Sequence, residues 1–207
     1  EFRRVLFRSR ICAGNVDVEV GKTVYTGLLN QRGGYESDLT VLRLKTQEFM
    51  LITGSAQAVR DADWIGRNVD TEAHIFLTDV TSAWSVLALM GPRSRDVLKK
   101  LTKVDLSNKA FPFASWQQID LGYATVIANR MTYVGELGWE LVVPVEFTVG
   151  VYEDLMLVGA DSGIRDAGYY ALEGLRLEKG FRAWSRELTP DISPFQAGLG
   201  FTVAFEK

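Results

Sequence analysis

The sequence has few of the residues on which several kinds of site depend. Among 207 residues it has one cysteine, Cys12, and one histidine, His74. A single cysteine cannot form an internal disulfide, which favours a reducing compartment, and Cys12 is predicted to be a small buried hydrophobe. A Ser-His or Cys-His pair could use only His74, which has no recognisable partner and is assigned a structural role. No His or Cys pair stands at metal-ligand spacing, so no metal site is expected.

Long apolar runs and an excess of basic residues are missing as well. No run of about eighteen apolar residues exists, so no membrane-spanning segment is expected. The net charge of -3 and the pI near 5.3 give no electrostatic reason for a nucleic-acid partner. Neither a phosphate-binding loop nor a G-x-G-x-x-G motif after a strand occurs. The 47% of hydrophobic residues nevertheless suffices for a sizeable core.

Both ends of the chain look cut. The first ten residues hold four arginines and no helical periodicity, and they lack an initiator methionine. Residues 1–9 are therefore interpreted as a non-native leader. Residues 198–207 stop inside a strand-like run that no turn closes. We expect residues 10–207 to be part of a domain that is truncated at both ends.

Apolar runs divided by turn signals predict mainly antiparallel strands. Residues 23–53 are typical of a β-meander, and further strands are predicted over residues 74–80, 84–90, 115–121, 123–132 and 139–143. Helical spacing predicts helices over residues 55–69, 91–101, 145–159 and 167–179. Strand pairs divided by helices, without steady βαβ alternation, indicate an α+β fold. We treat the chain as one integrated module rather than as separate domains, and this module could contain two α+β subunits.

Two of these helices carry more detailed expectations. Ser55 is a plausible N-cap for the helix over residues 55–69. The helix over residues 167–179 is expected to have a mixed apolar face and to stop at Gly180. That face consists of Tyr170, Leu172, Leu175 and Leu177.

Two carboxylates stand out because each opens an apolar strand just after glycines. Asp38 follows Gly33-Gly34, and Glu140 follows Gly138. With the period of two in a strand, part of the surroundings of each carboxylate should be apolar, and a carboxylate placed there needs a partner. The alternative from the residues alone is an edge-strand acid that discourages aggregation, or a turn-capping acid.

Five motifs, in order, resemble the aminomethyltransferase (glycine-cleavage T-protein) family. The resemblance runs from about Gly14 to Val203, and the order and spacing of the motifs make it specific although each motif alone is weak. The motifs are Val24-Tyr25-Thr26 through Asn30, Gly33-Gly34-x-x-Ser37-Asp38-Leu39-Thr40-Val41, Met90-Gly91-Pro92, Arg130-x-x-Tyr133-x-Gly135-Glu136-x-Gly138-x-Glu140, and Leu175-Arg176-x-Glu178-Lys179-Gly180. Residues 37–40, 133–140 and 178–184 are more similar to the module in dimethylglycine and sarcosine dehydrogenases than to the stand-alone enzyme.

The resemblance implies a module that holds tetrahydrofolate in a central cavity. Asp38 would be the catalytic residue, which orients the folate amine or accepts its proton as that amine attacks an iminium or methylene donor. Glu140 would anchor the pterin ring, and the two acids would converge on it. Tyr25 and Tyr133 also match folate-site positions, although core packing explains either phenol equally well.

The resemblance also implies partners outside this sequence. In the dehydrogenase branch an upstream FAD domain oxidises an N-methyl amine, and folate captures the product as 5,10-methylenetetrahydrofolate. That flavin domain and a final barrel-like domain are absent here, so the fragment alone could be inactive. The compartment would be the bacterial cytoplasm or, in a eukaryote, the mitochondrial matrix.

The chain departs from the family pattern at two places. Thr53 stands where stand-alone T-proteins tend to have an asparagine, and Leu172-Glu173 stands where they often have Arg-Asp. No folate-tail or carrier-protein contact is therefore assigned at residues 172–173. Arg176 is explained at least as well as a helix-surface residue or as a partner of Glu173. Three alternatives remain: a stand-alone aminomethyltransferase acting on a lipoyl-bound substrate, a non-catalytic folate-binding or regulatory module, and an α+β interaction domain with no folate site.

Overall fold

A computed structural model describes residues 11–69 and 75–207, and in it the chain forms two compact units. The first unit comprises the chain up to Thr78 together with Arg182–Lys207, and the second unit comprises Asp79–Phe181. The predicted leader, residues 1–9, and His74 lie outside the described residues. Each unit combines an antiparallel sheet with helices, so the predicted α+β class is confirmed.

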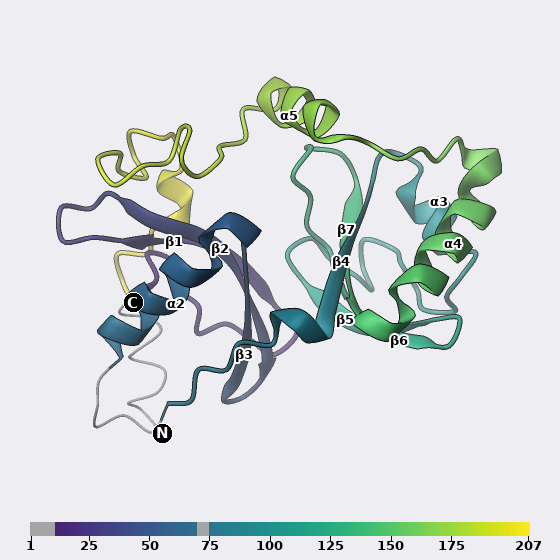
Figure 1. The fold of residues 1–207 in the computed structure, drawn as a ribbon, viewed down its shortest axis with the longest axis horizontal. Coiled ribbons are helices and arrows are strands. Elements are labelled where there is room, and N and C mark those ends of the chain that lie inside the picture. Colours follow the sequence, from purple (N-terminus) through teal and green to yellow (C-terminus); the bar gives the residue numbers. More distant parts are fainter. Residues whose placement is uncertain (1–10, 70–74) are drawn as a thin grey trace. The chain divides into compact units, whose positions relative to one another are not determined.

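The first unit is built on a three-stranded meander. Consecutive antiparallel strands pair in the order β1-β2-β3 (Figure 1), which confirms the meander predicted over residues 23–53. The strands are β1 (Thr23–Leu29), β2 (Tyr35–Lys45) and β3 (Glu48–Thr53). β2 begins at Tyr35, before the apolar run from which the strand was predicted. Its first turn-side residues, Tyr35 and Ser37, are buried although they are polar, so the hydrophobic pattern did not include them.

One face of this sheet packs against a helix. A 3-10 turn, Ser55–Gln57, leads into α2 (Ala58–Asn68), whose Ile65 joins a core with Leu28, Leu39 and Val41. The prediction of Ser55 as an N-cap is wrong, because this residue lies inside the 3-10 turn and no side chain caps either helix start. Cys12 belongs to the same core and is 4% exposed, as predicted.

The C-terminal segment returns to the first unit and packs beside β1 and β2 (Figure 1). The amide of Tyr35 donates to the carbonyl of Thr189 at 3.1 Å, and the amide of Ala204 donates to Ala13 at 2.9 Å. A Cβ on Gly34 would lie 1.8 Å from the carbonyl oxygen of Pro190, so only glycine fits where β2 begins. The strand predicted after residue 198 is wrong: the segment forms one 3-10 turn, Gly200–Thr202, and pairs with no strand.

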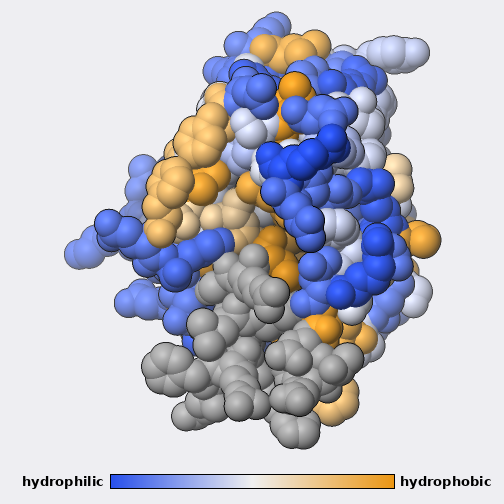
Figure 2. All heavy atoms as spheres, turned by 90° about the vertical axis from the view of Figure 1, so that its left-hand side faces the viewer, coloured by the Kyte–Doolittle hydropathy of each residue, from blue (hydrophilic) through white to orange (hydrophobic). Residues whose placement is uncertain are grey.

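Aromatic side chains of this segment remain on the surface. The rings of Phe195 and Phe205 stack with centroids 5.9 Å apart, and Phe201 is 79% exposed. Figure 2 shows hydrophobic residues grouped between hydrophilic ones on the face that it presents. Leu188, by contrast, is fully buried against Tyr35, so the segment is anchored by its aliphatic residues rather than by its phenylalanines.

The second unit is built on a four-stranded antiparallel sheet in the order β4-β7-β6-β5. Its strands are β4 (Trp84–Met90), β5 (Trp116–Leu121), β6 (Ala124–Asn129) and β7 (Gly138–Pro144). All four were predicted, and β5 and β6 form the expected hairpin around Gly122. The strand predicted over residues 74–80 is wrong for its described part, because residues 75–80 form no strand.

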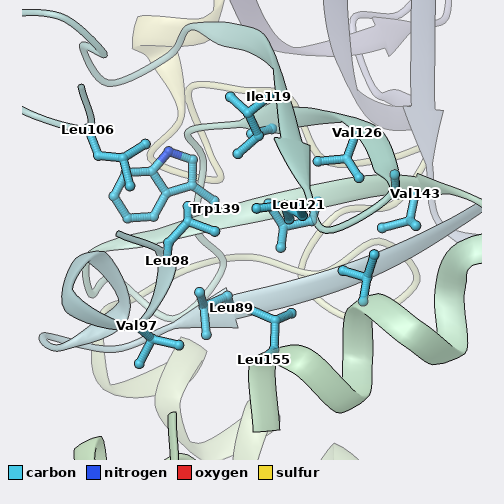
Figure 3. Close-up of a cluster of buried hydrophobic side chains, with 14 of the residues drawn as sticks. Leu89, Val97, Leu98, Leu106, Ile119, Leu121, Val126, Trp139, Val143 and Leu155 are labelled. Carbon is cyan, nitrogen blue, oxygen red and sulfur yellow. The ribbon is translucent and has the colours of Figure 1, made fainter. Parts of the chain in front are cut away.

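The core of the second unit lies between the sheet and two of its helices (Figure 3). Val97 and Leu98 of α3 (Ser94–Leu98) and Leu155 of α4 (Thr148–Gly159) contribute to it. Both helices fall within predicted ranges, although α3 is shorter than expected.

The third helix, α5 (Tyr169–Glu178), exists as predicted but buries a different face. Tyr170 is 93% exposed, and the residue that α5 buries fully is Arg176. The Arg176 guanidinium donates to the carbonyl of Phe181 at 2.7 Å and pairs with Glu173, so these partners offset the cost of burying its charge. Gly180 has a φ of 69°, which is consistent with its predicted role as the C-terminal stop.

Candidate functional site

Asp38 and Tyr25 form a hydrogen-bonded pair on one face of the first sheet. In the register of β1 and β2, Gly27 lies opposite Asp38 and Tyr25 lies opposite Thr40. The two side chains are therefore diagonal neighbours on the same face. The phenol of Tyr25 donates to Oδ2 of Asp38 at 2.9 Å. The structure thus brings together two of the four residues that the resemblance singled out.

The surroundings of Asp38 favour its neutral form. Burial raises the pKa of this carboxyl above its ordinary value, and the negative charge of Asp61 adds to the rise. Hydrogen bonds from Tyr25, from the backbone and from Gln57 act in the opposite direction but do not cancel the effect. An acid of this kind can hold or release a proton closer to neutral pH than a surface aspartate can.

Glu140 occupies the corresponding kind of position in the second unit. It lies on β7 between Ala88 of β4 and Asn129 of β6, so it is on an interior strand of the sheet. The Asn129 side chain, which is fully buried, donates to Oε2 of Glu140 at 3.0 Å. Burial raises the pKa of Glu140, and the bond from Asn129 offsets part of that rise. Among the described residues, no group donates to Oε1 of Glu140.

The neighbour of Glu140 in sequence holds β7 in place from the opposite face. Trp139 is fully buried, and its ring meets Phe111 edge-on with centroids 6.0 Å apart. Figure 3 shows the Trp139 side chain among the apolar residues of the second core. Because successive strand residues point to opposite faces, a fixed Trp139 also fixes the side on which Glu140 stands.

Tyr133 lies before β7 in the segment that joins it to β6. Its ring is half-buried and packs against Phe181 with centroids 6.2 Å apart. Gly135 follows with a φ of 68°, a conformation that favours glycine. Tyr133 and Glu140 belong to the second unit, whereas Asp38 and Tyr25 belong to the first.

Sequence reasoning missed the side chains that support these acids. Asn129, Gln57 and Asp61 are all at most 8% exposed, yet none was considered as part of a site. Gln57 and Asp61 stand four residues apart and four more precede Ile65, so all three occupy one helical face. That spacing was a readable signal for buried polar groups. Asn129 gave no such signal, because the strand register that sets it beside Glu140 is not visible in the sequence.

Two kinds of feature are absent from the part of the chain that the structure describes. Residues 11–69 and 75–207 contain no group of three or more His, Cys, Asp or Glu side chains that could hold a metal ion. In the same ranges no helix is long and apolar enough to cross a membrane.

The chain is similar to proteins of known kind over nearly all of its length. Residues 5–207 match the family described as the GCVT N-terminal domain. Mouse mitochondrial sarcosine dehydrogenase is 42% identical over 204 residues, which are 92% of this chain and 22% of that protein. The mouse mitochondrial pyruvate dehydrogenase phosphatase regulatory subunit is 38% identical over 194 residues, 93% of this chain and 22% of that protein.

A solved structure has the same fold. The glycine cleavage system aminomethyltransferase T from Bartonella henselae superposes with a TM-score of 0.79 at 27% identity, over 97% of this chain and 53% of that one. The chain thus spans about a fifth of the length of its two curated relatives and about half of the solved structure. Dehydrogenases of sarcosine and dimethylglycine are among its relatives. The chain belongs to the aminomethyltransferase (glycine-cleavage T-protein) family and corresponds to the N-terminal domain of that family.

Proposed function

We propose that this chain is the tetrahydrofolate-binding, one-carbon transfer module of an FAD-dependent enzyme like dimethylglycine or sarcosine dehydrogenase. Family membership and the 42% identity with a sarcosine dehydrogenase support this assignment. The observation that carries it is chemical: each unit holds a buried or half-buried carboxylate of raised pKa beside a neutral donor, Tyr25 for Asp38 and Asn129 for Glu140.

Glu140 would anchor the pterin. A reduced pterin presents adjacent N–H and amino donors, and a carboxylate accepts such a pair through both of its oxygens. Asn129 already holds Oε2, while Oε1 accepts no hydrogen bond from the described residues. Fixed by its neighbours on β4 and β6, this carboxylate fits the donors of the ring. Tyr133 would supply an aromatic wall and a hydroxyl at the same ligand.

Asp38 would be the catalytic residue. Tetrahydrofolate, when bound, supplies the nucleophilic amine. The Asp38 carboxylate would hold that amine by a hydrogen bond and take its proton as the new bond to carbon forms. Tyr25 holds Oδ2 of the carboxylate by a hydrogen bond, which would restrict the orientation of the Asp38 side chain. Because burial raises the pKa of Asp38, the group is a stronger base than a surface aspartate.

The reaction partners follow from this role. The one-carbon donor would be the iminium formed when an N-methyl amine is oxidised at FAD, in a domain joined covalently to this chain. The folate nitrogens would bond to its methylene carbon as the bond from that carbon to the amine breaks, so the products would be 5,10-methylenetetrahydrofolate and the demethylated amine. Since the mouse relatives are mitochondrial proteins, we place a eukaryotic form in the mitochondrial matrix, and we place a bacterial form in the cytoplasm.

The proposal is tested in the protein that contains this chain, by folate binding and by formation of 5,10-methylenetetrahydrofolate. Asp38→Ala should abolish transfer and leave the fold intact, since Asp38 is not part of the core. Asp120→Ala, which removes an exposed acid on β5, is the control and should change neither. Unchanged transfer kinetics in the Asp38 variant would remove Asp38 from the mechanism.

Two alternatives have a specific observation in their favour. The similarity to a phosphatase regulatory subunit favours a non-catalytic folate-binding or regulatory module. That reading predicts folate binding without turnover. The similarity to a glycine-cleavage aminomethyltransferase favours a stand-alone enzyme acting on a lipoyl-bound substrate. That reading predicts transfer from an aminomethyl-lipoyl donor and no flavin domain in the same open reading frame.

A further inference from the structure

The first unit buries a second carboxylate close to Asp38. Asp61 lies in the first turn of α2 and is 2% exposed. A buried carboxylate usually has a cationic partner, yet among the described residues no Lys or Arg lies within salt-bridge distance of Asp61. The neighbouring Arg60 pairs instead with Glu36 and lies over the Trp184 ring. A charge buried without a counter-ion calls for an explanation beyond packing.

Hydroxyl groups from two strands converge on this carboxylate. Ser37 of β2 donates to Oδ2 of Asp61 at 2.8 Å, and Thr53 of β3 donates to the same oxygen. Oδ1 of Asp61 is buried and has no hydrogen-bond partner among the described residues. Asp61 therefore ties α2 to both strands while one of its oxygens stays unsatisfied, an arrangement that favours protonation of the group.

The same cluster reaches the backbone of Asp38 through Ser37. Ser37 directly precedes Asp38 in β2, so the bond from Ser37 to Asp61 holds the backbone from which Asp38 projects. Gln57 donates to the hydroxyl of Ser37 at 3.0 Å. Asp61, Ser37 and Gln57 thus form one hydrogen-bonded network at the strand end that carries Asp38.

We infer that Asp61 is a positioning residue for Asp38, which fixes the strand end through Ser37 and Gln57 and disfavours a second negative charge on Asp38. The inference rests on the proposed function only where it names Asp38 as the catalytic group. The geometry and the electrostatic coupling of the two carboxyls stand without it.

Several described groups face the two acids and shift their pKa values in opposite directions. Around Asp38, burial and the charge of Asp61 raise its pKa, while Tyr25, Gln57 and its own backbone lower it. Burial raises the pKa of Asp61 as well, and Thr53, Ser37 and the charge of Arg60 lower it. Tyr35 is nearby, and its phenol pKa is raised by burial and by the charge of Asp38. Among the described residues, Asp61 is the one group whose negative charge raises the pKa of Asp38.

The test is a carboxyl ¹³C NMR titration of Asp38 in the wild type, in Asp61→Asn and in Asp63→Asn. The asparagine keeps an oxygen that accepts from Ser37 and Thr53 but removes the charge. Asp63 is exposed on the same helix and pairs with Arg67, so its variant is the matched control. We expect the pKa of Asp38 to fall in Asp61→Asn and to stay unchanged in Asp63→Asn.

A folded Asp61→Asn variant with an unshifted Asp38 titration would overturn the inference, because a purely structural carboxylate predicts lost stability alone. If that variant does not fold, the wild type decides: the Asp38 resonance should show a second step at the pH where Asp61 titrates, and a single step would overturn the coupling. These measurements use neither folate nor turnover, so their failure is distinct from a failure of the proposed function. Where transfer is active, the acid limb of its pH profile should move to lower pH in Asp61→Asn.

Discussion

Replacing Glu140 by glutamine should separate ligand binding from stability. Glutamine has the shape of glutamate, and its carbonyl oxygen can accept the hydrogen bond that Asn129 now donates to Oε2. The substitution removes the charge that burial disfavours and places an amide where the proposed pterin contact needs an acceptor. The apo protein should therefore fold at least as well as the wild type, while folate binding weakens.

The size of the binding loss follows from the hydrogen bonds that the charge supports. A hydrogen bond to a charged group contributes about 1.5–3 kcal/mol. In the variant, an N–H donor of the pterin would face the NH2 group of glutamine, which cannot accept a hydrogen bond, and this adds to the loss of binding free energy. We therefore expect the Kd for tetrahydrofolate to rise by roughly 10- to 150-fold, since about 1.4 kcal/mol corresponds to a factor of ten.

The pH dependence of the free energy of unfolding tests the burial of the Glu140 charge independently of folate binding. Because the folded state raises the pKa of Glu140, it binds more protons than the unfolded state at pH values between the two pKa values. This carboxyl therefore makes the free energy of unfolding fall as pH rises through that interval. Glu140→Gln removes that fall, so the variant should gain stability relative to the wild type above the raised pKa.

Calorimetric titration with tetrahydrofolate and urea unfolding at pH 4 and pH 7 measure the two effects. Glu146→Gln, an exposed acid just after β7, is the control and should change neither. Equal folate affinity in Glu140→Gln and the wild type would refute the anchoring role. A variant that is less stable than the wild type at pH 7 would refute the account of the buried charge.

Three further outcomes test the fold and the Asp38 site. Leu141→Ala, which truncates a fully buried side chain of β7, should lower the free energy of unfolding by about 2–5 kcal/mol, whereas Leu157→Ala at a 76% exposed position should change it by less than about 0.5 kcal/mol in urea unfolding. Tyr25→Phe removes a hydrogen bond that lowers the pKa of Asp38, so an NMR titration should find that pKa higher than in the wild type; a lower value would contradict the geometry. Gly34→Ala should cost about 1–3 kcal/mol, because the added methyl group overlaps a backbone oxygen, and unfolding at the wild-type midpoint would contradict that close approach.

The strands that could be predicted from the sequence are those in which an apolar run also has a hydrogen-bonded partner strand close to it in the chain. Residues 23–53 alternate between apolar runs and turn residues, and each run has a partner next to it in the chain. Residues 75–80 and 198–207 also carry apolar residues but form no ladder with another strand. Periodicity indicates which face could be buried, whereas only the fold supplies the hydrogen-bonding partner.

Helix faces were harder to predict than helices. α5 was placed correctly, yet its tyrosines are exposed and Arg176 is buried, because a carbonyl and an acid bind the two terminal nitrogens of its guanidinium. Asp61 was missed although it shares a helical face with Gln57 and Ile65, because an aspartate in an amphipathic helix is expected on the solvent side. Buried polar residues depend on partners from other elements, and such partners are not adjacent in the sequence.

The central claim is that this chain binds tetrahydrofolate and that Glu140 anchors it, and calorimetric titration tests the claim most directly. Titration of the wild type should show saturable binding of tetrahydrofolate, which Glu140→Gln weakens and Glu146→Gln leaves unchanged. No binding by the wild type, or equal affinity in Glu140→Gln, would contradict the claim.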